Sequence, residues 1–239
     1  MNFTSNSSAV THIGHVRSHN EDAFLEKPEV GLWAIADGMG GHEAGDFASQ
    51  LIINSLDDLK INILDQSFIE EIKSSLYESN SRLIELGEKH ERINGSTVIT
   101  MVLNGHTCDY IWAGDSRLYL LRDSKLVQLT KDHSQAEIYV ELGMLSRDEA
   151  NSHISANLLT RCIGTDDSLQ LDFGSSDLMH GDRFLLSSDG LDKHLSHQEI
   201  EQILIAHERN EALSKLITMT LKKGGSDNVT VTIVDIMSQ

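Results

Sequence analysis

The sequence predicts an α+β layered sandwich, in which sheets and helices stack on one another. Its strand-like runs cluster in meanders, its amphipathic segments come in pairs, and the two kinds do not alternate in regular βαβ order. The hydrophobic fraction of 39% provides enough apolar surface for a folded core. Pro28 is the only proline, and no repeat or low-complexity stretch marks a boundary, so we expect a single domain over residues 1–239.

The N-terminal part is expected to begin with two short strands and a pair of helices. Hydrophobic runs predict strands at Ala9–Val16 and Leu32–Ala36. Apolar residues three and four positions apart predict a helix at Asp46–Leu59. A second helix is expected to start at Ser67, because Ser67 and Glu70 have the spacing of a capping box.

The middle of the chain resembles an antiparallel meander followed by a polar segment. Four strand-like runs are expected, at Ser96–Leu103, Cys108–Trp112, Arg117–Leu121 and Lys125–Leu129. Turn-like pairs separate them, at Asn104-Gly105, Gly114-Asp115 and Asp123-Ser124. The segment at 134–160 is polar and weakly helical, with a second capping box at Ser146–Glu149, and is expected to form a mobile flap.

The C-terminal part predicts a strand, two helices and a closing strand. The strand is expected at Asp182–Ser187, and a capping box at Ser196–Glu199 begins the first helix. The second helix starts near Asn210 and stops at Gly224-Gly225, where glycine suits a helix end. The alternating run Val229–Ile236 predicts the last strand.

The charge balance is strongly acidic and excludes some classes of partner. The 239 residues carry 19 Lys and Arg against 37 Asp and Glu, for a net charge of −18. A nucleic acid partner is not expected, because a phosphate backbone requires a basic stripe. The first residues lack a signal peptide and no apolar run has the length of a membrane span, so we expect a cytoplasmic protein without membrane contact. Cys108 and Cys162 are expected to be reduced core thiols.

Acidic residues recur at the ends of predicted strands. Three apolar runs lead into an aspartate followed by a small residue, at Asp37-Gly38, Asp115-Ser116 and Asp189-Gly190. Asp227-Asn228 directly precedes the last strand, and the pair Glu21-Asp22 follows the first. Any one of these is typical of an ordinary turn. Five together, next to glycine, predict carboxylates that converge on one site.

Converging carboxylates repel one another unless a cation neutralises them, and Mg²⁺ or Mn²⁺ prefers oxygen ligands. The ligands are too scattered for an EF-hand, His42-Glu43 lacks the second histidine of a zinc motif, and no phosphate-binding P-loop occurs. A two-metal carboxylate site is the best remaining interpretation. The usual chemistry of such a site is hydrolysis of phosphate esters.

Six motifs in order resemble the metal-dependent protein phosphatase family, also called protein phosphatase 2C, in its compact bacterial form. These motifs are Arg17-Ser18-His19-Asn20-Glu21-Asp22, Ala36-Asp37-Gly38-Met39-Gly40-Gly41-His42, Gly95-Ser96-Thr97, Ala113-Gly114-Asp115-Ser116-Arg117, Ser187-Ser188-Asp189-Gly190-Leu191 and Gly225-Ser226-Asp227-Asn228-Val229-Thr230. They span nearly the whole chain. The resemblance implies a four-layer α-β-β-α sandwich, with two packed antiparallel sheets flanked by antiparallel helix pairs.

The resemblance also implies a role for each acidic residue. Asp37 would bridge two Mn²⁺ or Mg²⁺ ions, with the carbonyl of Gly38 as a further ligand. Asp189 and Asp227 would complete the first ion's ligands, Glu21 would serve the second, and Asp22 would orient metal-bound water. Asp115 matches a residue that helps to hold a third, weaker ion. Arg17 matches an arginine that grips the substrate phosphate, which its planar fork suits; the alternative is a surface ion pair with Glu21 or Asp22.

Two positions depart from the family pattern. Met39 stands where many relatives carry a histidine proposed as general acid, which leaves His42 and His19 as candidates by proximity alone. For His42, a surface or substrate-contact role is favoured over acid catalysis. Lys193 stands where relatives often carry an aspartate, and Asp192 is a candidate to replace it at the outer metal.

The expected function is hydrolysis of phosphoserine and phosphothreonine in proteins, by in-line attack of a hydroxide that bridges the two metals. The enzyme would be a monomer that opposes a bacterial Ser/Thr kinase. One alternative is a phosphatase for small phosphoesters or phosphotyrosine. Another is a catalytically weak phosphatase fold that serves as a regulatory or binding module, which the intact set of acidic residues and Arg17 argues against. An inert Ca²⁺-stabilised domain would leave Arg17 unexplained.

Overall fold

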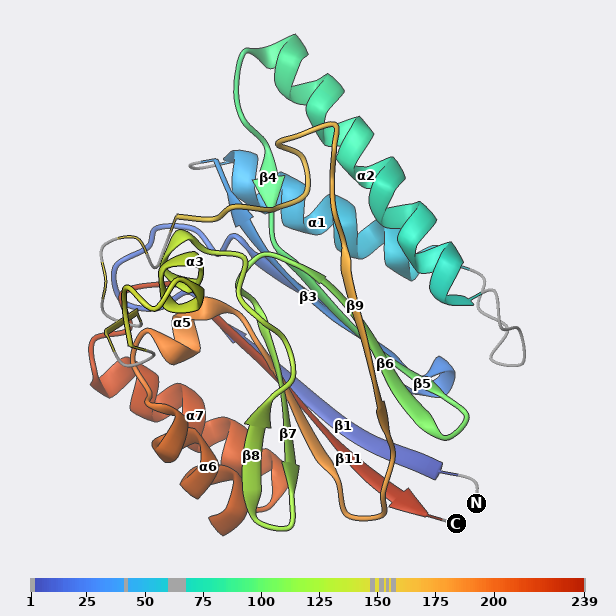
Figure 1. Ribbon diagram of the computed structural model, residues 1–239, viewed down its shortest axis with the longest axis vertical. Helices are drawn as coiled ribbons and strands as arrows, with labels where there is room; N and C mark the ends of the chain where they lie inside the picture. Colours follow the sequence, from blue (N-terminus) through green and yellow to red (C-terminus); the bar gives the residue numbers. More distant parts are fainter. Residues whose placement is uncertain are drawn as a thin grey trace.

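Two antiparallel sheets form the centre of the computed structural model (Figure 1). The structure describes residues 3–40, 43–59, 68–146, 149–150, 153, 155 and 158–238. One sheet has the strand order β1-β11-β10-β7-β8, and the other has the order β2-β3-β5-β6-β9, with β4 paired to β3. Within the described ranges, no helix combines the length and apolar character needed to cross a membrane.

The first sheet joins both ends of the chain. Its strands are β1 (Phe3–His12), β7 (Arg117–Arg122), β8 (Lys125–Gln128), β10 (Arg183–Ser187) and β11 (Val229–Ser238). β1 and β11 run side by side over ten residue pairs, from Phe3 opposite Ser238 to His12 opposite Val229. Its outer face is covered by α6 (His197–Ala206) and α7 (Arg209–Lys222), whose buried apolar residues pack against β10 and β11 (Figure 1).

The second sheet is built from the middle of the chain. Its strands are β2 (Asp22–Lys27), β3 (Leu32–Met39), β4 (Gly95–Ser96), β5 (Val98–Asn104), β6 (Thr107–Ala113) and β9 (Asp172–Asp177). A 3-10 turn at Pro28–Val30 joins β2 to β3. The outer face is covered by α1 (Glu43–Asp57) and α2 (Phe68–His90). Two short helices, α3 (Gln135–Glu141) and α5 (Asp189–Asp192), lie at one end of the sheets (Figure 1).

The apolar core divides into three clusters that correspond to the gaps between four layers. One lies between α1, α2 and the second sheet, and another lies between α6, α7 and the first sheet. The third fills the space between the sheets and contains the fully buried Trp33 and Phe184. The α+β four-layer sandwich is therefore confirmed, because each sheet buries one face against the other sheet and one against a helix pair.

The expected meander is wrong at Gly114-Asp115. β5 and β6 form a hairpin in the second sheet, whereas β7 and β8 form a hairpin in the first. Gly114 has a φ of +113°, and a Cβ atom there would lie 2.6 Å from Cβ of Thr97. The chain uses this glycine to cross between sheets, which places Asp115 at their common edge.

Other boundaries also differ from expectation. β1 ends at His12 rather than at Val16, because the chain turns at Gly14 and the His15 N–H donates to the carbonyl of Gly225. The strands β2 and β9 were not predicted. The capping boxes at Ser146–Glu149 and Ser196–Glu199 are both formed. Ser67 lies outside the described residues.

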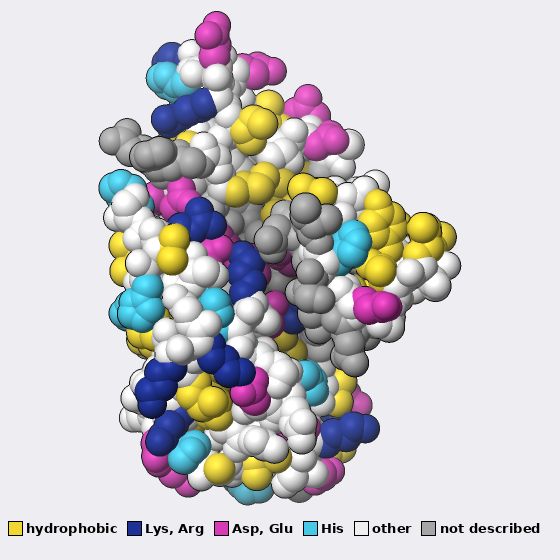
Figure 2. Space-filling view, turned by 90° about the vertical axis from the view of Figure 1, so that its left-hand side faces the viewer, with side chains coloured by type: hydrophobic (Ala, Val, Ile, Leu, Met, Phe, Trp, Pro, Cys, Tyr) yellow, Lys and Arg dark blue, Asp and Glu magenta, His cyan; other side chains and the backbone are white. Residues whose placement is uncertain are grey.

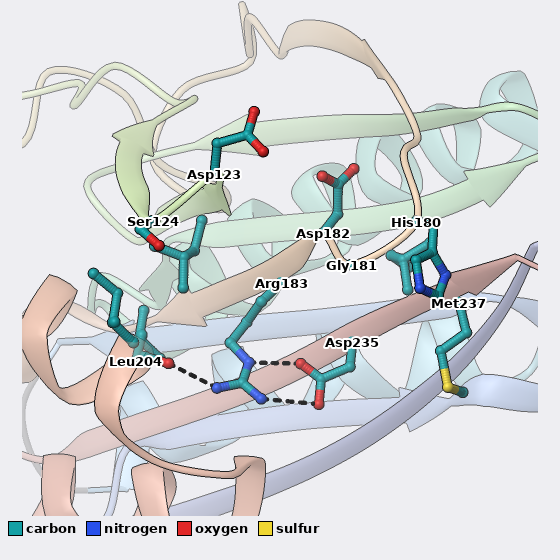
Figure 3. Close-up of a pocket in the computed structure, with 12 residues that line it drawn as sticks. Asp123, Ser124, His180, Gly181, Asp182, Arg183, Leu204, Asp235 and Met237 are labelled. Carbon is teal, nitrogen blue, oxygen red and sulfur yellow. Dashed lines mark hydrogen bonds and ion pairs between the residues drawn. The ribbon is translucent and has the colours of Figure 1, made fainter.

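A surface cavity of about 400 Å³ near the far end of the first sheet is lined by an arginine that is paired with an aspartate (Figure 3). Arg183 Nε lies 2.6 Å from Asp235 Oδ1, and its Nη1 donates to the carbonyls of Leu204 and His207, each at 2.8 Å. Arg183 thus satisfies the carbonyls at the end of α6 and fixes that helix to β10 and β11. These groups already have partners, so we assign them a structural role.

Replacing Arg183 with methionine is expected to lower the free energy of unfolding by about 2–4 kcal/mol, because two carbonyls lose their donor and Asp235 keeps only Arg209 as a partner. Urea unfolding measures this loss. Arg82→Met, on the exposed side of α2, is the matched control. Equal stability of the two variants would contradict the structural role of Arg183.

Candidate active site

The predicted acidic residues lie together at one end of the two sheets. Asp22 begins β2 and is the direct cross-strand partner of Asp37 in β3. Asp115 follows β6, Asp189 follows β10, and Asp227 precedes β11. Figure 2 shows this side of the molecule, where Lys and Arg side chains lie beside acidic ones. Asp22, Asp115 and Asp189 all lie near enough to Asp37 to raise its pKa by repulsion, in addition to the larger effect of burial.

Asp22 links the two sheets through its side chain. Its Oδ2 accepts hydrogen bonds from Ser188 Oγ at 2.8 Å and from Thr230 Oγ1 at 2.7 Å; Ser188 directly follows β10 and Thr230 lies in β11, both strands of the first sheet. Burial raises the pKa of Asp22 to about 7, against the lowering effect of these two hydrogen bonds, and Asp189 and Asp227 add repulsion. Ser188 and Thr230 were not predicted as site residues, although both lie inside the quoted motifs.

Asp37 and Gly38 are fixed mainly through the backbone. The Asp37 N–H donates to Thr97 Oγ1, and its carbonyl accepts from the Thr97 N–H. The N–H of Gly38 donates to the carbonyl of Glu21 at 3.0 Å. A Cβ at position 38 would collide with the carbonyl oxygen of Gly45 in α1, so the close approach of this helix requires glycine.

The loop before β2 is held by an asparagine from the other sheet. Asn228 Nδ2 donates to the carbonyls of Ile13 and His19, each at 2.9 Å, and its Oδ1 accepts from the Glu21 N–H at 2.8 Å. Asn228 directly follows Asp227, so one short segment orients both a carboxylate and the loop that carries Glu21. The sequence showed Asn228 as part of a motif but not this bridging role.

The centre of the cluster favours protonation while no cation is bound. Burial raises the pKa values of Asp37, Asp115 and Asp189, and neighbouring carboxylates add repulsion. For Asp189, the ammonium group of Lys193 partly offsets this rise. Closely spaced buried carboxylates are costly to ionise, which is the electrostatic condition that a divalent cation relieves.

Two cationic side chains hold Asp227. Arg17 Nε lies 2.7 Å from Asp227 Oδ1 and its Nη2 lies 3.0 Å from Oδ2, so the alternative pairing with Glu21 or Asp22 is not the one observed. Lys193 Nζ lies 2.7 Å from Asp227 Oδ2. Although burial acts in the opposite direction, these donors lower the pKa of Asp227. Arg17 remains 49% exposed, so it can also reach a ligand from solvent.

Asp192, the candidate outer metal ligand, is paired with an arginine through one of its two carboxylate oxygens. Its Oδ2 forms an ion pair with Arg117 Nη1 at 3.0 Å, and the same guanidinium group binds Asp132. Burial raises the pKa of Asp192 to about 7, which the charge of Arg117 only partly counteracts. Its Oδ1 is buried and has no hydrogen-bond partner, so the role of Asp192 as an outer metal ligand stays a prediction. The sequence did not indicate the Arg117 pairing.

The residues present fit divalent cations. Among the described residues, Asp22 Oδ1, Asp189 Oδ1 and Asp192 Oδ1 are buried carboxylate oxygens without a hydrogen-bond partner. An oxygen in this state is expensive unless a cation or water completes its coordination. In the same part of the chain, no three His, Cys, Asp or Glu side chains already stand at metal-ligand spacing. Lys193 occupies the gap between Asp189 and Asp227 instead.

The remaining predictions concern histidine, the thiols and the flap. His42 lies outside the described residues. Cys108 and Cys162 are buried free thiols, and burial raises the pKa of both. The predicted flap contains α3, and its ends are tied to the Asp115 loop, since the His133 N–H donates to the Gly114 carbonyl and the Thr160 N–H donates to the His133 carbonyl.

Comparison with known proteins agrees with this geometry. The family model described as protein phosphatase 2C matches residues 11–227. The serine/threonine protein phosphatase PstP of Mycobacterium tuberculosis is 34% identical over 226 residues, which are 94% of this chain and 43% of that protein. The chain thus spans less than half the length of this relative.

Solved structures of related proteins superpose on nearly the whole chain. PppA, described as a key regulatory component of T6SS in Pseudomonas aeruginosa, has a TM-score of 0.92 at 33% identity and covers 99% of this chain and 100% of its own. The catalytic domain of PstP in complex with two manganese ions has a TM-score of 0.89 at 32% identity, over 99% and 100% of the respective chains. With the motifs gathered at one end of a four-layer sandwich and the family model matching most of its length, this chain belongs to the protein phosphatase 2C family.

Proposed function

We propose that this protein is a metal-dependent protein phosphatase that hydrolyses phosphoserine and phosphothreonine. The observation that carries the proposal is the cluster of buried carboxylates with raised pKa values around Asp37, beside the half-exposed guanidinium of Arg17. Such a cluster needs cations, and cations beside an arginine form a site for a phosphate group. The manganese ions in the related catalytic domain support the same conclusion.

In this proposal the residues divide into metal ligands and groups that act on substrate. Two Mn²⁺ or Mg²⁺ ions would supply a nucleophile at neutral pH and neutralise charge on the phosphoryl oxygens. The protein ligands would be Asp37, the Gly38 carbonyl, Asp189, Asp227 and Glu21, and Asp115 would contribute to a third, weaker site.

Arg17 is placed to bind the substrate phosphate through its planar fork. To do so, it would share or leave its contact with Asp227, which is close to the protein surface. Asp22 would hold a proton or accept one through Oδ1, because Ser188 and Thr230 already fix its Oδ2. His42, which lies outside the described residues, stays the candidate for a further substrate contact.

The proposal extends to the whole chain and its surroundings. Residues 1–239 would form one catalytic domain, with the segment at 134–160 as a flap beside Asp115. The enzyme would act as a cytoplasmic monomer on phosphorylated proteins, without nucleic acid or membrane partners, and oppose a Ser/Thr kinase.

The test is hydrolysis of a phosphothreonine peptide and of p-nitrophenyl phosphate by the purified protein. We expect turnover with Mn²⁺ and its loss in excess EDTA, because the carboxylate cluster cannot bind a phosphate dianion without cations. A phosphotyrosine peptide measures the preference for phosphothreonine. Hydrolysis that persists in EDTA would refute the mechanism, and absence of hydrolysis with bound Mn²⁺ would favour a regulatory module.

A further inference from the structure

The side chain of Lys193 fills the position between two of the proposed metal ligands. Its Nζ lies 2.5 Å from Asp189 Oδ2 and 2.7 Å from Asp227 Oδ2. The two aspartates come from separate segments, one after β10 and the other before β11. A single ammonium group therefore joins the carboxylates that a divalent cation would also join.

Local structure keeps Lys193 at this site. α5 is a single turn, and the Lys193 N–H donates to the carbonyl of Asp189 at 3.0 Å. This turn places the lysine four residues after Asp189, at the spacing where side chains of opposite charge meet. The backbone of Lys193 cannot leave without unwinding the turn that positions Asp189, so only its side chain can move.

The observed contacts conflict with cation binding by both aspartates. Asp227 has both oxygens engaged, with Arg17 on Oδ1 and with Arg17 and Lys193 on Oδ2. Asp189 keeps Oδ1 buried without a hydrogen bond, while Oδ2 contacts Lys193. A cation that binds both carboxylates would lie next to the ammonium group, and repulsion between them would expel Lys193.

An adjacent cavity offers the displaced side chain a place. A cavity of about 670 Å³ lies beside α5, and Lys193 is one of its lining residues together with Asp192, Gln128 and Glu199. Two of these residues are acidic and one is an amide, so an ammonium group in this space has oxygen partners within the lining, which also includes the cations Arg117 and Lys223. Glu199 already binds Lys223, and Asp192 already binds Arg117, so these contacts would be shared.

We propose that Lys193 is a built-in counter-cation that holds Asp189 and Asp227 together in the metal-free protein and is displaced into the neighbouring cavity when a divalent cation binds. The proposal rests on the proposed function for the identity of the metal site. Lys193 thereby lowers the affinity for metal, because binding must first break its two ion pairs. It also protects the metal-free fold from repulsion between the two carboxylates.

The first experiment measures Mn²⁺ affinity by isothermal titration calorimetry of metal-free protein. Lys193→Met keeps the length of the side chain and removes its charge, and we expect it to bind Mn²⁺ at least about ten-fold more tightly than the natural protein. Its thermal midpoint in EDTA should fall, and saturating Mn²⁺ should reverse that fall. Lys125→Met, an exposed substitution on β8, is the matched control and should change neither value.

The second experiment needs no variant and remains decisive if Lys193→Met fails to fold. Acetylation of the natural protein by an N-hydroxysuccinimide ester, read by mass spectrometry, reports how accessible each lysine is. Lys193 is 24% exposed and doubly paired, so it should react slowly in EDTA and at least about three-fold faster with Mn²⁺. Lys125 should react equally in both conditions.

The outcomes separate this proposal from the proposed function. Equal Mn²⁺ affinities of the natural protein and Lys193→Met, or equal protection of Lys193 with and without Mn²⁺, would overturn the role of Lys193 alone. Failure to hydrolyse phosphopeptides despite Mn²⁺ binding and Lys193 release would overturn the catalytic function and leave the counter-cation. A protein that binds no Mn²⁺ would overturn both.

Discussion

Asp37→Asn is expected to lower Mn²⁺-dependent phosphatase activity by about 10³-fold or more while raising the stability of the metal-free protein. Asp37 lies near the end of β3. Burial raises its pKa, and repulsion from Asp22, Asp189 and Asp115 raises it further. The amide keeps the shape of the side chain but removes the negative charge that would bind both cations. It also removes a carboxyl group that must take up a proton or repel its neighbours at neutral pH, so the fold should gain stability in EDTA.

Two measurements on the same protein test this prediction. Initial rates with p-nitrophenyl phosphate at saturating Mn²⁺ give the loss of activity, and thermal unfolding in EDTA gives the change in stability. Asp123→Asn is the matched control, because Asp123 lies in the β7–β8 turn away from the cluster. A variant that is inactive and also less stable than the natural protein would indicate misfolding and contradict the electrostatic argument. An active variant would refute the role of Asp37.

The sequence predicted most elements whose pattern is local and apolar. The helix pairs follow from regular apolar spacing, and the capping box at Ser196 marks the start of α6. β9 was missed because its polar sequence alternates between half-buried and exposed positions at the edge of its sheet, so it lacks a hydrophobic run. Crossing between sheets at Gly114 depends on contact with Thr97, which no local pattern reveals.

The sequence indicated that the acidic residues lie together, but it did not indicate which cationic side chains pair with them. Strand ends and motifs indicated Asp37, Asp115, Asp189 and Asp227 without any knowledge of the fold. The pairing of Asp192 with Arg117 joins α5 to β7, and a contact between distant segments leaves no signal in residue spacing. Lys193 was noticed only as a departure from the family pattern. Its contact with Asp227 likewise appears only once β10 and β11 lie side by side.

Part of the net charge of −18 comes from the carboxylates gathered at the candidate active site. Carboxylates are concentrated where they repel one another, and Lys193 and Arg17 compensate only part of that repulsion. The metal-free fold therefore stores unfavourable electrostatic energy at one end of the sheets. The pH dependence of stability reports that energy directly, since protonation relieves it as cations do.

In EDTA, the thermal midpoint of the protein is expected to fall by on the order of 10 °C between pH 5.5 and pH 8. Burial raises the pKa of Asp22 from 3.8 to about 7 and that of Asp192 to about 7, and the pKa values of Asp37 and Asp115 also rise. Folding thus favours the protonated carboxyl groups. This stabilisation is complete below pH 3.8 and is lost as the pH rises through about 7.

Groups with the opposite shift do not cancel this trend. Burial lowers the pKa of His133, so that histidine costs stability as the pH falls below its unfolded value, but it is one group against several carboxylates. Glu199 has a pKa near 2 because Lys223 and Ser196 bind it, and it loses its stabilising contribution only at lower pH. Between pH 5.5 and 8 the acidic cluster therefore determines how the thermal midpoint changes with pH.

Differential scanning fluorimetry in EDTA and in saturating Mn²⁺ distinguishes the cluster from the rest of the protein. Mn²⁺ should remove the fall, because cations favour the deprotonated carboxylates. Asp22→Asn should flatten the EDTA curve, since its amide cannot ionise beside Asp189 and Asp227, whereas Asp123→Asn should leave the curve unchanged. A thermal midpoint that stays level or rises from pH 5.5 to 8 in EDTA would mean that ionisation of the buried carboxylates does not destabilise the fold. The carboxylates would then not need cations to offset their repulsion, and the assignment of the site to metal binding would lose its electrostatic basis.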